Sequence, residues 1–198
     1  MDTARASAPA APGAPSDESP IDPRWFGRGM AVIRIFFGVI LFANGLAKIE
    51  PELGRIDIGP YHTNLITRSG ARGILDFEIN NRQVTRDAPK GTEVPGLRRF
   101  VNDVVLARWG FFQWVVTLTE LGAGALLILG LATRLAALIG LGQQLFLALV
   151  YASSNRWLFE QPHEYVPLIV LALLPAGRAW GLDGWLVRRD AGLRRWPF

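Results

Sequence analysis

Residues 111–131 read FFQWVVTLTELGAGALLILGL, and this stretch decides the fold. A helix needs about 20 apolar residues to cross the hydrocarbon core of a bilayer, which is the length of this run. Its one ionisable residue is Glu120, and a charged group at that depth costs roughly 2.5–3.5 kcal/mol on insertion scales. Such a residue is normally paired, hydrated or functional. The stretch therefore predicts a membrane helix whose carboxylate needs a partner.

The composition favours a membrane protein. Half of the 198 residues are hydrophobic and 19% are charged, whereas about 25% of the residues in soluble domains are charged. The sequence has no cysteine, which excludes disulfides and thiol chemistry on this chain. The net charge of +4 is spread along the chain. No basic block is dense enough to predict nucleic-acid binding.

Three further apolar runs predict three more spans. They are residues 30–47 (MAVIRIFFGVILFANGLA), residues 135–151 (LAALIGLGQQLFLALVY) and residues 163–174 (HEYVPLIVLALL). The last run is short, so we expect this span to start earlier, near Trp157. A turn of five residues or fewer joins the second and third spans, which makes them an antiparallel hairpin. The sequence thus predicts an all-α membrane protein with a four-transmembrane-helix bundle.

The arginines beside the short loops set the expected orientation, because cytoplasmic loops are enriched in Lys and Arg. If both termini are cytoplasmic, eight arginines that flank the spans all lie on the cytoplasmic side: Arg24, Arg28, Arg134, Arg178, Arg188, Arg189, Arg194 and Arg195. We therefore expect an N-in, C-in topology. Residues 1–24 are rich in Ala, Pro and Ser and predict a disordered cytoplasmic tail. Residues 25–49 form the first span, residues 111–177 the other three, and residues 178–198 a basic cytoplasmic tail.

Residues 50–110 form an insert between the first two spans, which we expect to be an extracytoplasmic cap. Nine basic and eight acidic residues make the stretch 50–109 nearly neutral. A helical spacing relates Leu97, Phe100, Val101, Val104 and Arg108, which predicts an amphipathic helix at the outer interface. Within the same insert, Ile74–Asn80 is expected to form a strand.

Polar and small residues form one stripe on each predicted span. The stripes are Arg34, Gly38, Leu41, Gly45 and Lys48 on the first, Gln113, Thr117, Glu120 and Gly124 on the second, and Gly140, Gln144, Ala148 and Tyr151 on the third. Membrane helices associate through such residues because lipid supplies no hydrophobic drive for association. We therefore expect the stripes to face the interior of the bundle.

The depth of each residue guides the choice of partner for Glu120. At 1.5 Å of rise per residue, Arg34 lies roughly 9 Å above Arg28 and Glu120 roughly 21 Å above Arg134. Arg34 and Glu120 are thus at different levels, and Asn44, Gln143 and Gln144 become candidate partners. Three interpretations stay open for Glu120: a polar network that fixes helix register, a protonatable group at a cleft for a lipophilic ligand, and a transport pathway.

No metal site is predicted. His163 follows Glu160 at the spacing E-x-x-H, but metal sites in helix bundles need further carboxylates from neighbouring helices.

Three motifs resemble the DoxX/DoxD family of small four-helix bacterial membrane proteins. They are RIFFGVILFANGLAKI (Arg34–Ile49), TELGAGALLILGLATRLAAL (Thr119–Leu138) and AGRAWGLDGWL (Ala176–Leu186). The second is similar to the most recognisable stretch of the family. In the third, Gly181 stands where the family usually has serine. The resemblance covers roughly residues 30–49 and 97–186.

The resemblance implies a location in the bacterial plasma membrane and a link to quinone chemistry. DoxD-type members are the small membrane subunit of a thiosulfate:quinone oxidoreductase, and DoxX-type members associate with membrane oxidoreductases. We therefore expect an integral membrane subunit of a quinone-linked oxidoreductase with partner subunits, surrounding lipid and no covalently bound cofactor. A homo-oligomer is a second candidate assembly. The alternative is a non-catalytic scaffold that recruits partners through residues 50–110.

Seven residues are the candidates for such a site. Glu120 and Arg34 are the expected catalytic residues. The residues expected to bind the quinone are Asn44, Lys48, Thr117, Gln143 and Gln144.

Overall fold

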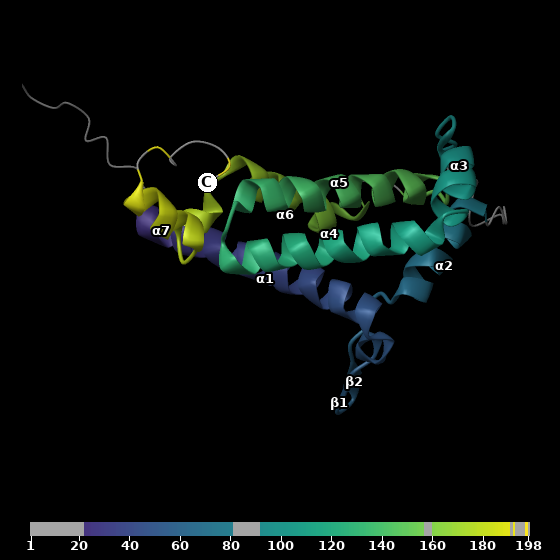
Figure 1. The fold of residues 1–198 in the computed structure, drawn as a ribbon, viewed down its shortest axis with the longest axis horizontal. Helices are drawn as coiled ribbons and strands as arrows, with labels where there is room; N and C mark the ends of the chain where they lie inside the picture. The colour runs from purple at the N-terminus through teal and green to yellow at the C-terminus, as the bar shows by residue number, and fades with distance from the viewer. Residues whose placement is uncertain (1–21, 81–91, 157–159, 191, 193–196, 198) are drawn as a thin grey trace, which may run out of the picture.

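The protein is an elongated bundle of helices with small elements at both ends (Figure 1). The computed structural model describes residues 22–80, 92–156 and 160–190, together with residues 192 and 197. Of the expected tail at residues 1–24, residues 1–21 lie outside these ranges, and Pro23 and Arg24 belong to the first helix. One end of the bundle, here called the terminal end, contains the start of α1 and helix α7. Helices α2 and α3 lie at the other end, here called the cap end.

Four helices make the bundle: α1 (Pro23–Ile49), α4 (Trp109–Leu129), α5 (Thr133–Ala152) and α6 (Pro162–Leu173). The first three are long and apolar enough to cross a membrane, so three of the four expected spans are present as candidate membrane helices. Helix α6 is shorter, at 12 residues, or roughly 18 Å at 1.5 Å per residue. Its expected earlier start near Trp157 lies outside the described residues.

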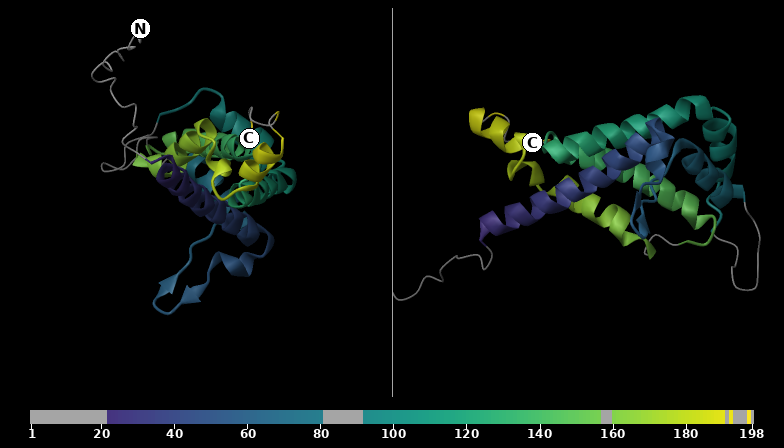
Figure 2. Two further views of the ribbon diagram at one scale, coloured as in Figure 1. Left: turned by 90° about the vertical axis from the view of Figure 1, so that its left-hand side faces the viewer. Right: turned by 90° about the horizontal axis from the view of Figure 1, so that it is seen from below.

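Helix α1 crosses the bundle diagonally and packs mainly on α4 (Figure 2). Glycines permit this close approach. A Cβ atom on Gly38 would lie 2.8 Å from the backbone nitrogen of Ile128, and one on Gly124 would lie 2.5 Å from that of Phe42. The predicted stripe on the first span is confirmed, because all five of its residues are buried in α1.

The C-terminal segment folds back onto the turn between α4 and α5. It consists of a 3₁₀ turn, η4 (Ala176–Arg178), and α7 (Leu182–Arg189). The buried carboxylate of Asp183 accepts hydrogen bonds from the backbone N–H groups of Ala132 at 2.7 Å and Thr133 at 3.1 Å. Asp183 thus caps α5, although it belongs to another helix, and its own N–H donates to the carbonyl of Gly130 at 2.8 Å.

The cap end contains a second apolar core. Helix α2 (Arg68–Asn80), α3 (Leu97–Phe100) and a π-helical turn, η2 (Val101–Leu106), pack on the ends of α4 and α5. Leu75, Ile79, Val101 and Val105 are buried there. A helical segment begins at Leu97, as the spacing predicted. Its location at the outer membrane interface stays a prediction.

The expected strand at Ile74–Asn80 is wrong, because these residues form the second half of α2. Leu75, Glu78 and Ile79 are its buried residues, at the i, i+3, i+4 spacing of a helix. Packing of that face on α4 and α5 decides the conformation over the β-propensity of the isoleucines.

A short 3₁₀ turn and a β-hairpin connect α1 to α2. The turn is η1 (Pro51–Gly54), and the strands β1 (Asp57–Ile58) and β2 (Tyr61–His62) pair in antiparallel fashion. The hairpin projects away from the helices (Figures 1 and 2). Tyr61 near its tip is 76% exposed.

Candidate functional site

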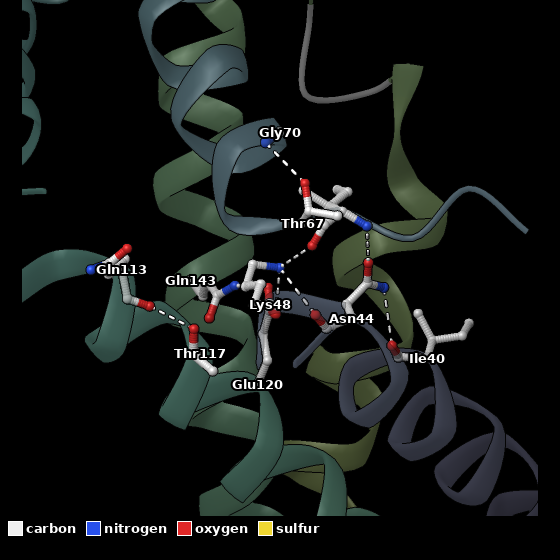
Figure 3. Close-up of polar contacts among 10 residues, drawn as sticks. Ile40, Asn44, Lys48, Thr67, Gly70, Gln113, Thr117, Glu120 and Gln143 are labelled. Atoms are coloured by element: carbon white, nitrogen blue, oxygen red, sulfur yellow. Dashed lines mark hydrogen bonds and ion pairs between the residues drawn. The ribbon is translucent and has the colours of Figure 1, made fainter. Parts of the chain in front are cut away.

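A buried ion pair joins α1 to α4 (Figure 3). The Nζ atom of Lys48 lies 2.6 Å from Oε2 of Glu120, and their side chains are only 2% and 9% exposed. The other carboxylate oxygen accepts a hydrogen bond from Nε2 of Gln143 on α5, at 2.8 Å. Three of the expected site residues therefore meet at one point, and both oxygens of the carboxylate are satisfied.

The same lysine holds the chain that leads into α2. Lys48 Nζ donates to the carbonyl of Ile66 at 3.0 Å. One turn earlier on α1, the side-chain oxygen of Asn44 accepts from the N–H of Ile66 at 2.9 Å. Both polar backbone atoms of Ile66 are thus bound by α1. Asn44 was expected to be a partner of Glu120, but its side-chain oxygen instead binds the chain at Ile66 that leads into α2.

Thr117 and Gln144, two more of the expected site residues, make their described contacts elsewhere. Thr117 is buried one turn from Glu120, and its hydroxyl donates to the carbonyl of Gln113 at 2.6 Å. Gln144 lines a small pocket with Tyr151 and Glu164, on the side of α5 that faces α6.

The stagger of α1 explains why Lys48 meets Glu120. Arg34 lies beside the turn that ends α4, and its NH1 atom donates to the carbonyl of Leu127 at 3.0 Å. From that level α1 runs antiparallel to α4, because Gly38 packs against Ile128 and Gly45 packs against Leu121. Lys48 is one turn beyond Gly45, which brings it to the level of Glu120. Counting from Arg28 hid this match, because α1 starts well before the level of that turn.

Arg34 belongs to a separate polar centre at the terminal end. It is fully buried, and NH2 donates to the carbonyl of Trp180 at 3.0 Å. Its described partners are backbone carbonyls of α4 and of the C-terminal segment. Arg34 therefore ties this segment to the bundle, and the structure does not bring it together with Glu120.

An apolar pocket lies next to the ion pair. Lys48, Glu120 and Gln143 form its polar side. The other walls include Ala71, Ile74 and Leu75 of α2, Trp109 and Val116 of α4, and Phe146, Leu147 and Tyr151 of α5. Lys48 is in the last turn of α1, whereas α4 continues 11 residues beyond Glu120 to Trp109. Beyond the end of α1, helix α2 packs on α4 and α5 in its place. The pocket is the space between α2, α4 and α5.

The pocket holds about 60 Å³. Water occupies about 30 Å³ in the liquid, and an apolar cavity of about 150 Å³ binds benzene. In this conformation the space fits small molecules and is too small for a six-membered ring.

The family of this region can now be stated. Residues 86–153 match the family model described as DoxX. The chain contains a DoxX family domain. No curated protein and no solved structure matches the chain.

The DoxX domain includes only part of the candidate site. Thr117, Glu120, Gln143 and Gln144 lie within the matched residues, as does the motif Thr119–Leu138. Lys48 and the motifs Arg34–Ile49 and Ala176–Leu186 lie outside them. The ion pair therefore links the DoxX domain to a helix outside the matched range.

Proposed function

We propose that this protein is an integral membrane subunit of a quinone-linked oxidoreductase, with four spans and both termini on the cytoplasmic side of a bacterial plasma membrane. The observation that carries the proposal is the apolar pocket bounded by Lys48, Glu120 and Gln143. Ligand sites commonly combine apolar walls with a few convergent polar groups. An intramembrane ionisable pair is also a site candidate by default.

The chemistry of the lining fits a quinone headgroup. Quinone carbonyls accept hydrogen bonds, and the ammonium of Lys48 and the amide of Gln143 are donors on one side of the pocket. Glu120 is the group able to hold a proton beside them. A bound quinone would accept two electrons and two protons, and the electrons would come from a partner subunit. On this chain, the residues bind the headgroup and hold a proton.

The volume requires a movement of α2 when a ring enters. Polar contacts hold α2 near each end: Ile66 is bound by Lys48 and Asn44, and Glu78 contacts Ser154 and Arg156 beyond α5. The Glu78–Arg156 contact spans 3.7 Å, and the Glu78 side chain is only 5% exposed. Entry of a ring would therefore have to move α2 against contacts at both of its ends.

The cap end is the proposed docking site for the partner subunit. The hairpin β1–β2 projects from the bundle, and Tyr61 and Ile56 on it are exposed. Tyr is enriched at protein interfaces. Affinity purification from native membranes, with the full chain and with Tyr61→Ser, tests this assignment. A redox subunit retained by the first and lost by the second is expected; equal recovery of partners would contradict docking at the hairpin.

Photolabelling with an azidoquinone tests the ligand site directly. The purified full chain in nanodiscs is labelled, and the labelled residues are mapped by mass spectrometry. We expect labels on α2 and α5 residues of the pocket. Gln143→Leu removes a donor, and Gln144→Leu is the matched control on the adjacent residue. Labelling that maps elsewhere, or that falls equally in both variants, would contradict the proposal.

A non-catalytic scaffold is the second candidate function. The hydrogen bonds of the ion pair favour it, because Lys48 and Glu120 satisfy each other and join α1, α4, α5 and the start of α2. For a scaffold, Glu120→Gln would lower thermal stability without changing quinone labelling or quinone reduction in membranes. For the proposed subunit, the same variant would lower both quinone labelling and quinone reduction.

A further inference from the structure

The C-terminal segment, formed by η4 and α7, is held on the bundle with little apolar burial. Helix α7 packs mainly on η4, and η4 packs on α1 and α5 at the terminal end (Figure 1). The buried residues of α7 are Asp183 and Gly184, whereas its large apolar residues Leu182 and Trp185 are exposed. Regions with few buried apolar contacts open most readily in native proteins. This segment is therefore the part of the terminal end best suited to open locally.

Two residues at the junction with the bundle have a backbone conformation that L-residues rarely adopt. Ala132, which precedes α5, has a φ of 47°, and Trp180, which precedes α7 by two residues, has a φ of 50°. This region brings Cβ too close to the following carbonyl oxygen, so it is costly for most residues other than glycine. Among the described residues, the third case is Asn155, and Asn tolerates this region better. Backbone strain is thus concentrated where the C-terminal segment meets the bundle.

Each strained residue is held by a polar contact across this junction. The N–H of Ala132 donates to Asp183 Oδ1 at 2.7 Å, and the carbonyl of Trp180 accepts a hydrogen bond from Arg34 at 3.0 Å. The side chain of Trp180 points out of the core and is 62% exposed, so its burial does not offset the strain. Strained backbone persists only where surrounding contacts fix it. Asp183 and Arg34 therefore hold the two strained residues in place.

Two buried polar atoms at the same junction find no hydrogen-bond partner among the described residues. They are Arg34 Nε and Thr133 Oγ1, and both side chains are fully buried. A buried polar group without a partner opposes the closed packing. Movement of the C-terminal segment away from the bundle would expose this junction, which lowers the free energy that opening requires.

We propose that residues 176–189 form a clasp that opens as one unit while α1, α4 and α5 stay folded. Asp183 and Arg34 close the clasp against the strain at Ala132 and Trp180. Opening lets both strained residues return to ordinary backbone conformations. It also frees the guanidinium of Arg34 and the first N–H groups of α5 together. The clasp lies at the end of the bundle opposite α2, and its opening does not depend on a ligand in the pocket beside Glu120.

Residue-resolved hydrogen exchange by NMR, on the full chain in detergent micelles, tests this proposal. The N–H groups of Asp183 and Thr133 are the reporters, because they lie on opposite sides of the junction and are hydrogen-bonded across it. We expect equal protection factors for the two, below those of amides in the middle of α4. Ala132→Gly and Trp180→Gly, made separately, remove the strain of the closed state, because glycine adopts positive φ readily. Each should raise both protection factors about fivefold, given the cost of a left-handed L-residue.

Asn155→Gly is the matched control, because it places glycine at a positive-φ residue outside the clasp. The protection of Asp183 and Thr133 should not change in this variant. Clearly different protection factors for the two reporters in the unmodified protein would overturn opening as one unit. Unchanged protection in both clasp variants, or an equal rise in the control, would show that strain at the junction does not drive the opening.

Discussion

Lys48 Nζ lies 2.6 Å from Glu120 Oε2, and this contact sets where α1 ends relative to α4. Glu120 is in the middle of α4, but its partner is in the last turn of α1. The pair therefore marks the level at which α1 stops and the insert begins. The positive side chain also lies at the C-terminal end of α1, where the helix dipole favours a cation.

Removing one partner of this pair should destabilise the protein strongly. Lys48→Met leaves Glu120 buried without its cation and leaves the carbonyl of Ile66 without its donor. Breaking a buried ion pair in this way costs about 3–5 kcal/mol. We expect a large fall in the unfolding temperature of the purified protein in detergent. An unchanged unfolding temperature would mean that the pair contributes nothing to the fold.

The contact between α1 and α4 should depend on one glycine of α4 and not on its neighbour. Gly124→Ala places a methyl group 2.5 Å from the backbone nitrogen of Phe42, and overpacking of this kind costs about 1–3 kcal/mol. Gly122→Ala is the matched control, because a Cβ atom there meets nothing within 4 Å. Ala is favoured over Gly in a helix by roughly 0.5–1 kcal/mol, so the control should unfold at the same or a higher temperature.

If the two glycine variants lose stability equally, close backbone approach is not the reason for Gly124. Thermal unfolding of both, in the same detergent, measures the difference.

The C-terminal segment should come loose when its cap is removed. Asp183→Ala deletes the carboxylate that binds the N–H groups of Ala132 and Thr133. Loss of a helix cap costs about 0.5–2 kcal/mol. We expect faster hydrogen exchange at the start of α5 and faster proteolysis after Arg178. Asp190→Ala is the control, since that exposed carboxylate accepts only the N–H of Gly192 among the described contacts; equal exchange in both would contradict the capping role.

The sequence predicted the bundle well because its signals are local. Length and hydropathy alone define three spans, and the helical stripe of α1 correctly marks its buried face. The helix from Leu97 followed from the same spacing. The hairpin at Asp57–His62 was missed. The segment Ile74–Asn80 was wrongly expected to be a strand, because packing on α4 and α5 decides its helical conformation.

Three of the seven expected site residues lie together, namely Lys48, Glu120 and Gln143, but the pairing of Lys48 with Glu120 was not predicted. Gln143 was expected beside Glu120 and does bind it, whereas Lys48 was assigned to the site without a partner. Its partner depends on the stagger of α1, and no single helix contains that information. The contacts of Gly38 with Ile128 and of Gly45 with Leu121 define that stagger. They become visible only when α1 and α4 are packed together.

Locking α2 should close the pocket. The natural chain has no cysteine, so Leu75→Cys with Leu147→Cys introduces two thiols that line the pocket from α2 and α5. A short bifunctional thiol reagent then joins the two helices. We expect azidoquinone labelling to fall to background in the joined protein and to persist in each single variant treated with the same reagent. Full labelling of the joined protein would show that α2 need not move.

The most direct test of the account replaces both charges at once. In Lys48→Met with Glu120→Leu, apolar groups of similar size replace the pair, and such replacements are often neutral for stability. The account predicts an unfolding temperature near that of the unmodified protein together with loss of azidoquinone labelling in the pocket. If the double variant is stable and its pocket residues are labelled as in the unmodified protein, the ion pair serves the fold alone and the proposed ligand site is contradicted.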